Sequence, residues 1–248
     1  MAAPAIGRRP RWAPGAGAEI DWSHPLAAGL ETFVVPSLLV DLTGRRSVAV
    51  VGAVKLADPK AVGNGASGFV AASAYLTVGP SSSPIVGPLA NATITGVYTA
   101  PNTGAGNDHS IYCERAATGN DIAKLTYASA GGTLNCAQAA WRNDAGTLIN
   151  LPSTIAVGDG LVHATSNIRR ATTTCEIWDD GKLGASTTNG AMTTAFTNAG
   201  ISNRIGVDLQ DTSGAFPGTV HAVILHSRAL SAGEVAQLHA DPFCMLRS

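Results

Sequence analysis

The sequence predicts an all-β fold: a two-sheet antiparallel jelly-roll sandwich with an extended N-terminal arm and one short C-terminal helix. Short β-favouring runs alternate with Gly, Asn, Asp and Pro along most of the chain. A helical apolar period is missing despite abundant Ala, except near the C-terminus. No internal repeat is visible, so we expect one domain in residues 20–248, preceded by an arm in residues 1–19.

The arm is rich in Ala, Pro, Gly and Arg, and Trp12 is its only large apolar side chain. Two interpretations remain open for it: a tether that docks on a neighbouring subunit, or a disordered tail. No apolar block follows Arg8, Arg9 and Arg11, so we do not expect a secretory signal.

The expected strands are short, and the last one is apolar on both faces. Residues 220–227 place apolar side chains at odd and at even positions, which indicates a strand buried on both sides. The full set of expected strands is 26–35, 47–55, 74–78, 92–98, 110–113, 122–127, 133–139, 147–149, 161–168, 173–178, 204–207 and 218–226.

One helix is expected after the last strand. Ser231 and Glu234 have the spacing of a reciprocal N-terminal capping box, and Leu230 and Val235 stand where a hydrophobic staple would close over it. Pro242 cannot continue the helical hydrogen bonds. The helix is therefore predicted to end at about residue 241.

Charge is scarce in this chain. Charged residues make up 13% of it and the formal net charge is −1, whereas ~25% charged residues is usual. This composition disfavours nucleic-acid binding. It favours a surface covered by a partner or by copies of the same chain, hence a homo-oligomer. The alternative is a neutral surface of Thr, Ser, Asn and Gly. No long apolar run occurs, so we expect no membrane span.

The four cysteines show no metal-binding spacing. Cys113, Cys136 and Cys175 alternate with apolar residues, as side chains facing a core do, and Cys244 lies near the end of the chain. We expect reduced, buried thiols in a protein made in a cytoplasm.

Several motifs resemble laminin-G-like, concanavalin A-like domains. The last strand follows Gly218 and leads into Arg228-Ala-Leu-Ser-x-x-Glu234, which is similar to the end of such domains. The resemblance covers about residues 20–242 and implies the sandwich fold. Further segments that carry it are 29–30, 41–44, 159–163, 175–183 and 204–206.

Both ends of the chain also resemble bacteriophage virion proteins of this class. The resemblance lies in the arginine- and proline-rich arm, in Asp21-Trp22-Ser-His-Pro25 and in Asp241-Pro-Phe243. It implies a non-enzymatic structural component of a virion, made in the bacterial host cytoplasm. Within the virion we expect a head decoration or accessory protein that binds the capsid or sister subunits. The alternative is a glycan-binding module of a phage fibre or tail that recognises a host surface polysaccharide.

No catalytic residue and no cofactor are predicted. A glycoside hydrolase of this fold needs two carboxylates on one face, about 5–9.5 Å apart. In the densest acidic cluster, Glu176 and Asp179 are three residues apart and should face opposite sides, and Asp180 belongs to an Asp-Gly turn. The cysteines lack an activating His motif, no Gly-x-Ser-x-Gly elbow occurs, and the six histidines lack zinc-type pairing.

Two groups of residues have the chemistry of a binding site. Asp208 and Asp211 could supply two oxygens to Ca²⁺, but no calcium motif accompanies them, so no metal site is predicted. Trp141, Asn143 and Asp144 have the chemistry of a glycan-binding loop, an apolar platform beside an amide and an acid. The alternative there is a Trp that closes the edge of the sandwich while the polar residues form a turn.

Overall fold

The structure is a computed structural model. It describes residues 17–56, 65–70, 73–79, 84–102, 109–115, 121–130, 133–142, 148–171, 173–188, 202–208 and 214–247. Side chains of residues 121, 122, 128–130, 133, 134 and 148 are outside this description.

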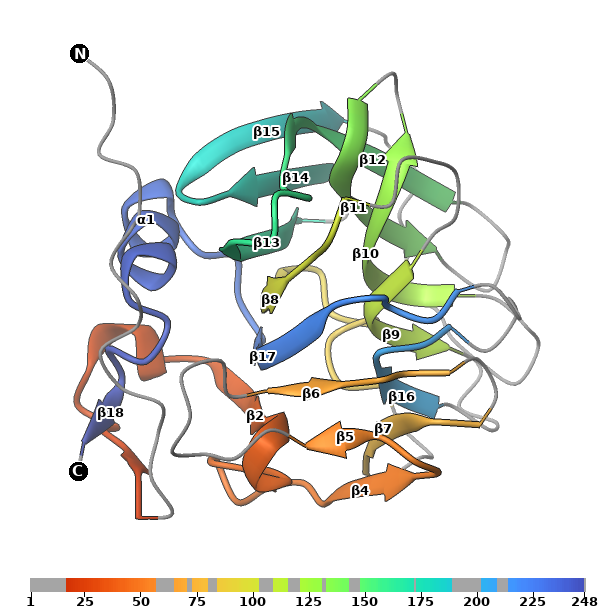
Figure 1. Cartoon of the computed structure of the whole chain (residues 1–248). Coiled ribbons are helices and arrows are strands. Elements are labelled where there is room, and N and C mark those ends of the chain that lie inside the picture. Colours follow the sequence, from red (N-terminus) through yellow and green to blue (C-terminus); the bar gives the residue numbers. More distant parts are fainter. Residues whose placement is uncertain are drawn as a thin grey trace.

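Two antiparallel sheets pack face to face, which confirms the predicted all-β sandwich (Figure 1). The seven-stranded sheet has the order β12-β11-β10-β9-β16-β7-β4. Its strands are β4 (Val48–Val51), β7 (Tyr75–Val78), β9 (His109–Arg115), β10 (Asp121–Ala130), β11 (Thr133–Arg142), β12 (Leu148–Ala156) and β16 (Ser202–Ile205).

The second sheet is nine-stranded, with the order β15-β14-β13-β8-β17-β2-β3 and the short pair β5 and β6 beside β17. Its strands are β2 (Leu30–Val35), β3 (Val40–Asp41), β5 (Lys55–Leu56), β6 (Ala66–Ser67), β8 (Ala92–Thr99), β13 (Val162–Arg170), β14 (Thr174–Asp179), β15 (Lys182–Thr188) and β17 (Thr219–His226).

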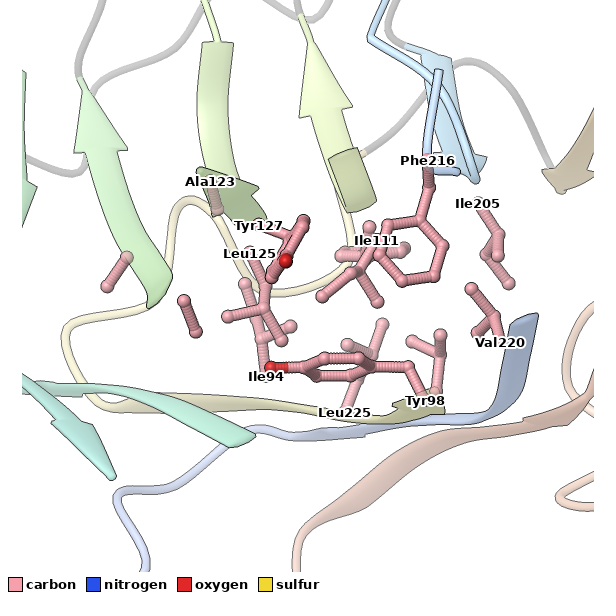
Figure 2. Packing of buried hydrophobic residues seen from close by; sticks show 14 of the residues in the cluster. Ile94, Tyr98, Ile111, Ala123, Leu125, Tyr127, Ile205, Phe216, Val220 and Leu225 are labelled. Atoms are coloured by element: carbon pink, nitrogen blue, oxygen red, sulfur yellow. The ribbon is translucent and has the colours of Figure 1, made fainter. Parts of the chain in front are cut away.

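The main core lies between the sheets, as Figure 2 shows. Few aromatic rings are present, and three of them meet at its centre. Phe216 packs edge-on against Tyr98 and Tyr127, with ring centroids 5.7 and 6.1 Å apart. Aliphatic side chains from both sheets fill the remaining space, among them Ile94, Ile111, Leu125, Ile205, Val220 and Leu225.

Strand β17 is buried on both faces, as its apolar pattern predicts. Val223 and Leu225 point into the core between the sheets. Ala222 and Ile224 point the other way, into a second cluster with Leu230. This cluster lies under helix α1 (Ala232–Ala240) and the segments next to both ends of the described chain.

Helix α1 has the predicted caps. Ser231 Oγ accepts from the Glu234 backbone N–H, and the Glu234 carboxylate accepts from the Ser231 N–H at 2.8 Å. The staple residues Leu230 and Val235 are fully buried. Asp241 is the C-cap residue. Local sequence signals therefore place this helix within a residue of its observed bounds.

Several boundaries differ from prediction. The strand expected at 26–35 begins with a 3₁₀ turn, Pro25–Ala27, and only Leu30–Val35 is extended. The run expected at 47–55 breaks at Gly52, whose φ is +71° and whose missing Cβ would lie 1.7 Å from Ser73 O. The strand expected at 147–149 continues to residue 156, because β12 is an edge strand and tolerates Pro152.

The expected arm, residues 1–19, lies mostly outside the described residues. Its last residue, Glu19, belongs to a strand. Strand β1 (Glu19–Ile20) pairs antiparallel with β18 (Leu246–Arg247), and Arg247 Nη2 lies 3.2 Å from Glu19 Oε2. The two ends of the described chain are therefore neighbours (Figure 1).

All four cysteines are free thiols, and three of them are buried as expected. Cys175 belongs to the core between the sheets, and burial raises its pKa to about 12. Cys113 differs from the expectation of a core-facing thiol. Its cross-strand partners are Lys124 and Arg204, on the outer face of the seven-stranded sheet. Cys244 is only partly buried.

Candidate functional site

Trp141, considered above as a sugar platform or as a Trp that closes the sandwich edge, is buried. Its ring is 1% exposed, and Nε1 donates to Asn167 Oδ1 at 2.6 Å. Strand β11 extends to Arg142, three residues beyond the expected end at residue 139, and the Trp141 ring belongs to the core. Asn143 and Asp144 lie outside the described residues. A buried ring offers no platform to a sugar, and its burial favours the alternative of a Trp that closes the sandwich.

The acidic cluster is divided between two faces and a turn, as predicted. Glu176 faces outward, where Arg170 binds it through two hydrogen bonds of 2.7 and 3.1 Å. Asp179 faces inward and accepts from the hydroxyls of Ser153 and Thr165. Burial raises the pKa of Asp179 to about 6, although these hydrogen bonds oppose the shift. Neither carboxylate stands opposite the other on one face, as a glycosidase pair would.

Asp180 and Gly181 form the predicted turn, with φ of +48° and +79°. The Asp180 carboxylate lies 2.7 Å from His163 Nδ1, and Asp159 lies 2.7 Å from His163 Nε2. Burial alone would lower the pKa of His163, but hydrogen bonds and charges of the two aspartates raise it to about 9. The imidazolium therefore joins the loop before β13 to the turn after β14.

Asp208, one of the two residues considered for calcium, is held by cations of the chain. Its carboxylate lies 2.9 Å from Arg115 Nη1 and 3.3 Å from Lys124 Nζ. Asp211 lies outside the described residues. Within the described part of the chain, no group of three or more His, Cys, Asp or Glu is placed to hold a metal ion. No helix among these residues is long and apolar enough to cross a membrane.

Trp22 is the one aromatic side chain among the described residues that is strongly exposed, at 52%. The guanidinium carbon of Arg45 lies 5.7 Å from its ring centroid. Arg45 Nη1 also lies 3.1 Å from Glu31 Oε2, so an aromatic ring, a cation and a carboxylate meet at the surface. We call Trp22, Glu31 and Arg45 the Trp22 surface.

The loop that carries Trp22 is fixed on both sides of the ring. Asp21 donates its N–H to Met245 O at 2.8 Å, and its carboxylate accepts from the N–H and the hydroxyl of Ser23. Further along, Arg228 donates to Ala28 O at 2.6 Å and to Pro25 O at 3.3 Å. Trp22 is therefore presented by a braced loop, which lowers the ordering cost of binding.

Arg45 is positioned by the turn after β3. The buried Asp41 carboxylate accepts from the N–H groups of Phe33, Thr43 and Arg46 at 2.8, 3.2 and 3.1 Å, and from the Thr43 hydroxyl at 2.6 Å. Arg45 Nη1 then donates to Leu30 O at 3.0 Å. This turn is the Asp-Leu-Thr-Gly segment noted in the sequence.

Sequence reasoning used Trp22 only as part of a resemblance and missed this surface. One signal was available. Trp22 stands between Asp21 and Ser23-His24-Pro25, a run of turn-forming residues with no apolar alternation. A large aromatic ring in such a turn has no strand or helix to bury it. Its proximity to Glu31 and Arg45 depends on tertiary packing.

No protein-family model matches the sequence, and no curated protein matches it. Solved structures do match the fold. The binding domain of Paraclostridial Mosquitocidal Protein 1 is 14% identical with a TM-score of 0.67, covering 85% of this chain and 51% of that chain. The receptor binding domain of botulinum neurotoxin C/D mosaic serotype is 11% identical with a TM-score of 0.65, covering 85% and 50%.

A third similar structure is Domain 4 of AbnA, a GH43 extracellular arabinanase from Geobacillus stearothermophilus, in complex with arabinotriose. It is 16% identical, its TM-score is 0.62, and the match covers 86% of this chain and 98% of that domain. This chain spans about half the length of the mosquitocidal and botulinum domains. At these identities the likeness shows a shared β-sandwich fold. The resemblance to bacteriophage virion proteins is not tested by these matches and stays a prediction.

Proposed function

We propose that this chain is a non-enzymatic binding module that holds a carbohydrate on the Trp22 surface. The observation that carries the proposal is the exposed Trp22 ring beside the Arg45–Glu31 ion pair. Binding sites combine an apolar wall with a few placed polar groups, and these three side chains supply both. The loops under them are braced, so little order has to be gained on binding.

Each group has a separate task in this proposal. The apolar C–H face of a sugar ring packs on the indole, which offers a large, rigid area with few rotatable bonds. The Glu31 carboxylate accepts from sugar hydroxyls, and Arg45 donates to ring or hydroxyl oxygens. Arg45 is 48% exposed and Glu31 is 28% exposed as side chains, so both are accessible to a ligand.

The similar structures support a binding role. The titles of two of them describe binding or receptor-binding domains, and the third is an enzyme's Domain 4 holding arabinotriose. The described acidic cluster supports a non-catalytic role, because its carboxylates are already engaged by Arg170, by His163 or by buried hydroxyls.

The test is a Trp22→Ala variant, with Leu161→Ala as the matched control. Leu161 is 64% exposed and precedes β13, so its truncation removes a comparable exposed apolar side chain elsewhere. Binding to bacterial surface polysaccharides and to arabino-oligosaccharides is measured by titration calorimetry. We expect Trp22→Ala to weaken binding at least about tenfold, near 1.4 kcal/mol, and Leu161→Ala to leave it unchanged. Equal affinities of wild type and Trp22→Ala would overturn the site.

A second candidate function is a structural role in a bacteriophage virion, as a head decoration or accessory protein bound to the capsid or to sister subunits. Trp and Arg are enriched at the energetic centres of protein interfaces, so the Trp22 surface also suits a protein partner. The low charge of the chain and its two terminal resemblances favour this setting.

Two measurements distinguish the candidates. Mass spectrometry of purified particles should find the chain in many copies if it is a virion component, and its absence would contradict that role. Trp22→Ala should lower occupancy on particles without changing any glycan affinity if the surface docks on protein. Removal of residues 1–16 tests whether the arm is a tether. Unchanged occupancy of the truncated chain on particles would contradict that interpretation.

A further inference from the structure

A second aromatic–arginine pair lies on the outer face of the seven-stranded sheet. The guanidinium carbon of Arg204 lies 4.0 Å from the Tyr75 ring centroid. Arg204 is on β16, and Tyr75 is on the neighbouring β7 (Figure 1). Both side chains alternate with core residues, Ile205 and Leu76, so they face away from the core between the sheets.

The stacked guanidinium keeps one edge open. Arg204 Nε donates to Ser202 Oγ at 2.9 Å, and Arg204 forms no ion pair within the described part of the chain. Among the described residues no hydrogen bond involves the two terminal nitrogens, which form a planar fork that matches the two oxygens of a carboxylate. Ser202 accepts through its oxygen, so its own hydroxyl proton can be donated to the same ligand.

A carboxylate near Arg204 is already engaged by other cations. Asp208 is paired with Arg115 at 2.9 Å and with Lys124 at 3.3 Å. Arg204 is partly buried beside Tyr75, and this burial lowers the pKa of its guanidinium. An oxyanion bound there would replace the missing solvation.

We propose that Arg204, Ser202 and Tyr75 form an oxyanion site that takes the carboxylate of an acidic carbohydrate. Arg204 binds the carboxylate end-on, Ser202 donates a hydroxyl hydrogen bond, and the Tyr75 ring holds the guanidinium plane. This site lies on the other sheet from the Trp22 surface and needs neither Glu31 nor Arg45. It therefore stands or fails independently of the proposed function.

The first test compares an acid with its neutral counterpart. An oligogalacturonate and its methyl ester are titrated into the whole chain, and binding is followed by calorimetry and by backbone amide shifts of residues 202–205. The acid should bind and the ester should bind at least about tenfold more weakly. Similar affinities for the two would overturn the proposal, since the ester lacks the charge that Arg204 recognises.

The second test uses variants. Arg204→Gln should weaken binding of the acid about tenfold or more, and Arg204→Lys should restore only part of it, because Lys keeps the charge and loses the fork. Arg247→Gln is the matched control, since Arg247 is an exposed arginine in the separate β1–β18 pair. Thermal melts of each variant establish that it is folded. Unchanged binding in folded Arg204→Gln, or an equal loss in Arg247→Gln, would overturn the site.

The third test identifies the source of the oxyanion. Sodium sulfate and sodium acetate are titrated against the same residues. Weak binding of both salts beside tighter binding of the oligosaccharide supports an acidic carbohydrate ligand. Binding of sulfate as tight as that of the oligosaccharide supports the oxyanion site but assigns it to free anions. Weaker binding of neutral sugars by the Trp22→Ala variant does not affect either result. Each proposal can therefore fail without the other.

Discussion

Arg228 Nη2 lies 2.7 Å from Glu234 Oε1, so an arginine in the connection after β17 forms an ion pair with the third residue of helix α1. The same arginine donates to Ala28 O and Pro25 O, which belong to the loop before β2. One side chain thus connects strand, helix cap and N-terminal loop. Arg228 and Glu234 of the sequence motif therefore form a tertiary ion pair, in addition to the helix cap that Glu234 makes with Ser231.

Glu234→Gln is expected to destabilise the fold near neutral pH and to have little effect in acid. The hydrogen bond from Arg228, with those from Ser231, lowers the pKa of Glu234 from 4.5 to about 2. A carboxylate with a depressed folded-state pKa contributes stability that is present above pH 4.5 and is lost as the pH falls toward 2. The ion pair is partly exposed, so we expect a loss of about 1–2 kcal/mol at pH 7.

Urea denaturation of wild type and Glu234→Gln at several pH values measures this difference. Their free energies of unfolding should differ at pH 7 and converge near pH 2. A difference that stays constant over this range would contradict the assigned role of the charge.

His163→Gln tests the bridge between Asp159 and Asp180, and the pH dependence has the opposite sign. The pKa of His163 is raised from 6.5 to about 9, so the bridge stabilises the fold fully below pH 6.5 and is lost as the pH rises through 9. Asp159 is 52% exposed, which limits the effect to about 1–2 kcal/mol. The variant should be less stable than wild type at pH 6 and equally stable near pH 10, as measured by denaturant titration.

The C-terminal strand and helix could be predicted from the sequence because their signals are local. The capping box spans four residues, and the apolar pattern of β17 shows within eight. The acidic cluster was assigned correctly for the same reason, since alternation alone sends Glu176 and Asp179 to opposite faces.

The site residues could not be predicted in this way. The expected strand ends at residue 139, which leaves Trp141 in a loop, whereas pairing with Ala123 and Ile149 extends β11 through Trp141. In the Trp22 surface, a turn at residue 22 contacts a second turn at residue 45, and Arg45 of that turn also pairs with Glu31. Contacts of this kind depend on which strands become neighbours.

Gly206→Ala is expected to destabilise the fold by about 2 kcal/mol or more. Gly206 has φ of +90°, and an added Cβ would lie 2.1 Å from a ring carbon of Phe69, which is itself buried. Alanine at position 206 would therefore strain the backbone and clash with the packed ring of Phe69. The melting temperature measures the loss.

Gly233→Ala is the matched control for this substitution. Gly233 lies in helix α1, and an added Cβ there would meet nothing within 4 Å. Alanine should therefore raise stability by about 0.5–1 kcal/mol. If both variants changed stability in the same direction, the local geometry of residue 206 would not explain the effect of Gly206→Ala.

Trp141→Phe separates the buried tryptophan from the exposed one. The change removes the N–H that donates to Asn167 Oδ1, and the one other donor to that oxygen among the described residues is the Cys175 thiol, 3.6 Å away. A buried acceptor that loses its strong donor should lower the free energy of unfolding by about 1–3 kcal/mol. Carbohydrate affinity per folded molecule should remain that of wild type, whereas Trp22→Ala should lose affinity and keep its stability. Denaturant titration and calorimetry on both variants measure the two quantities. A loss of affinity in folded Trp141→Phe would return the glycan site to the loop after β11 and argue against the Trp22 surface.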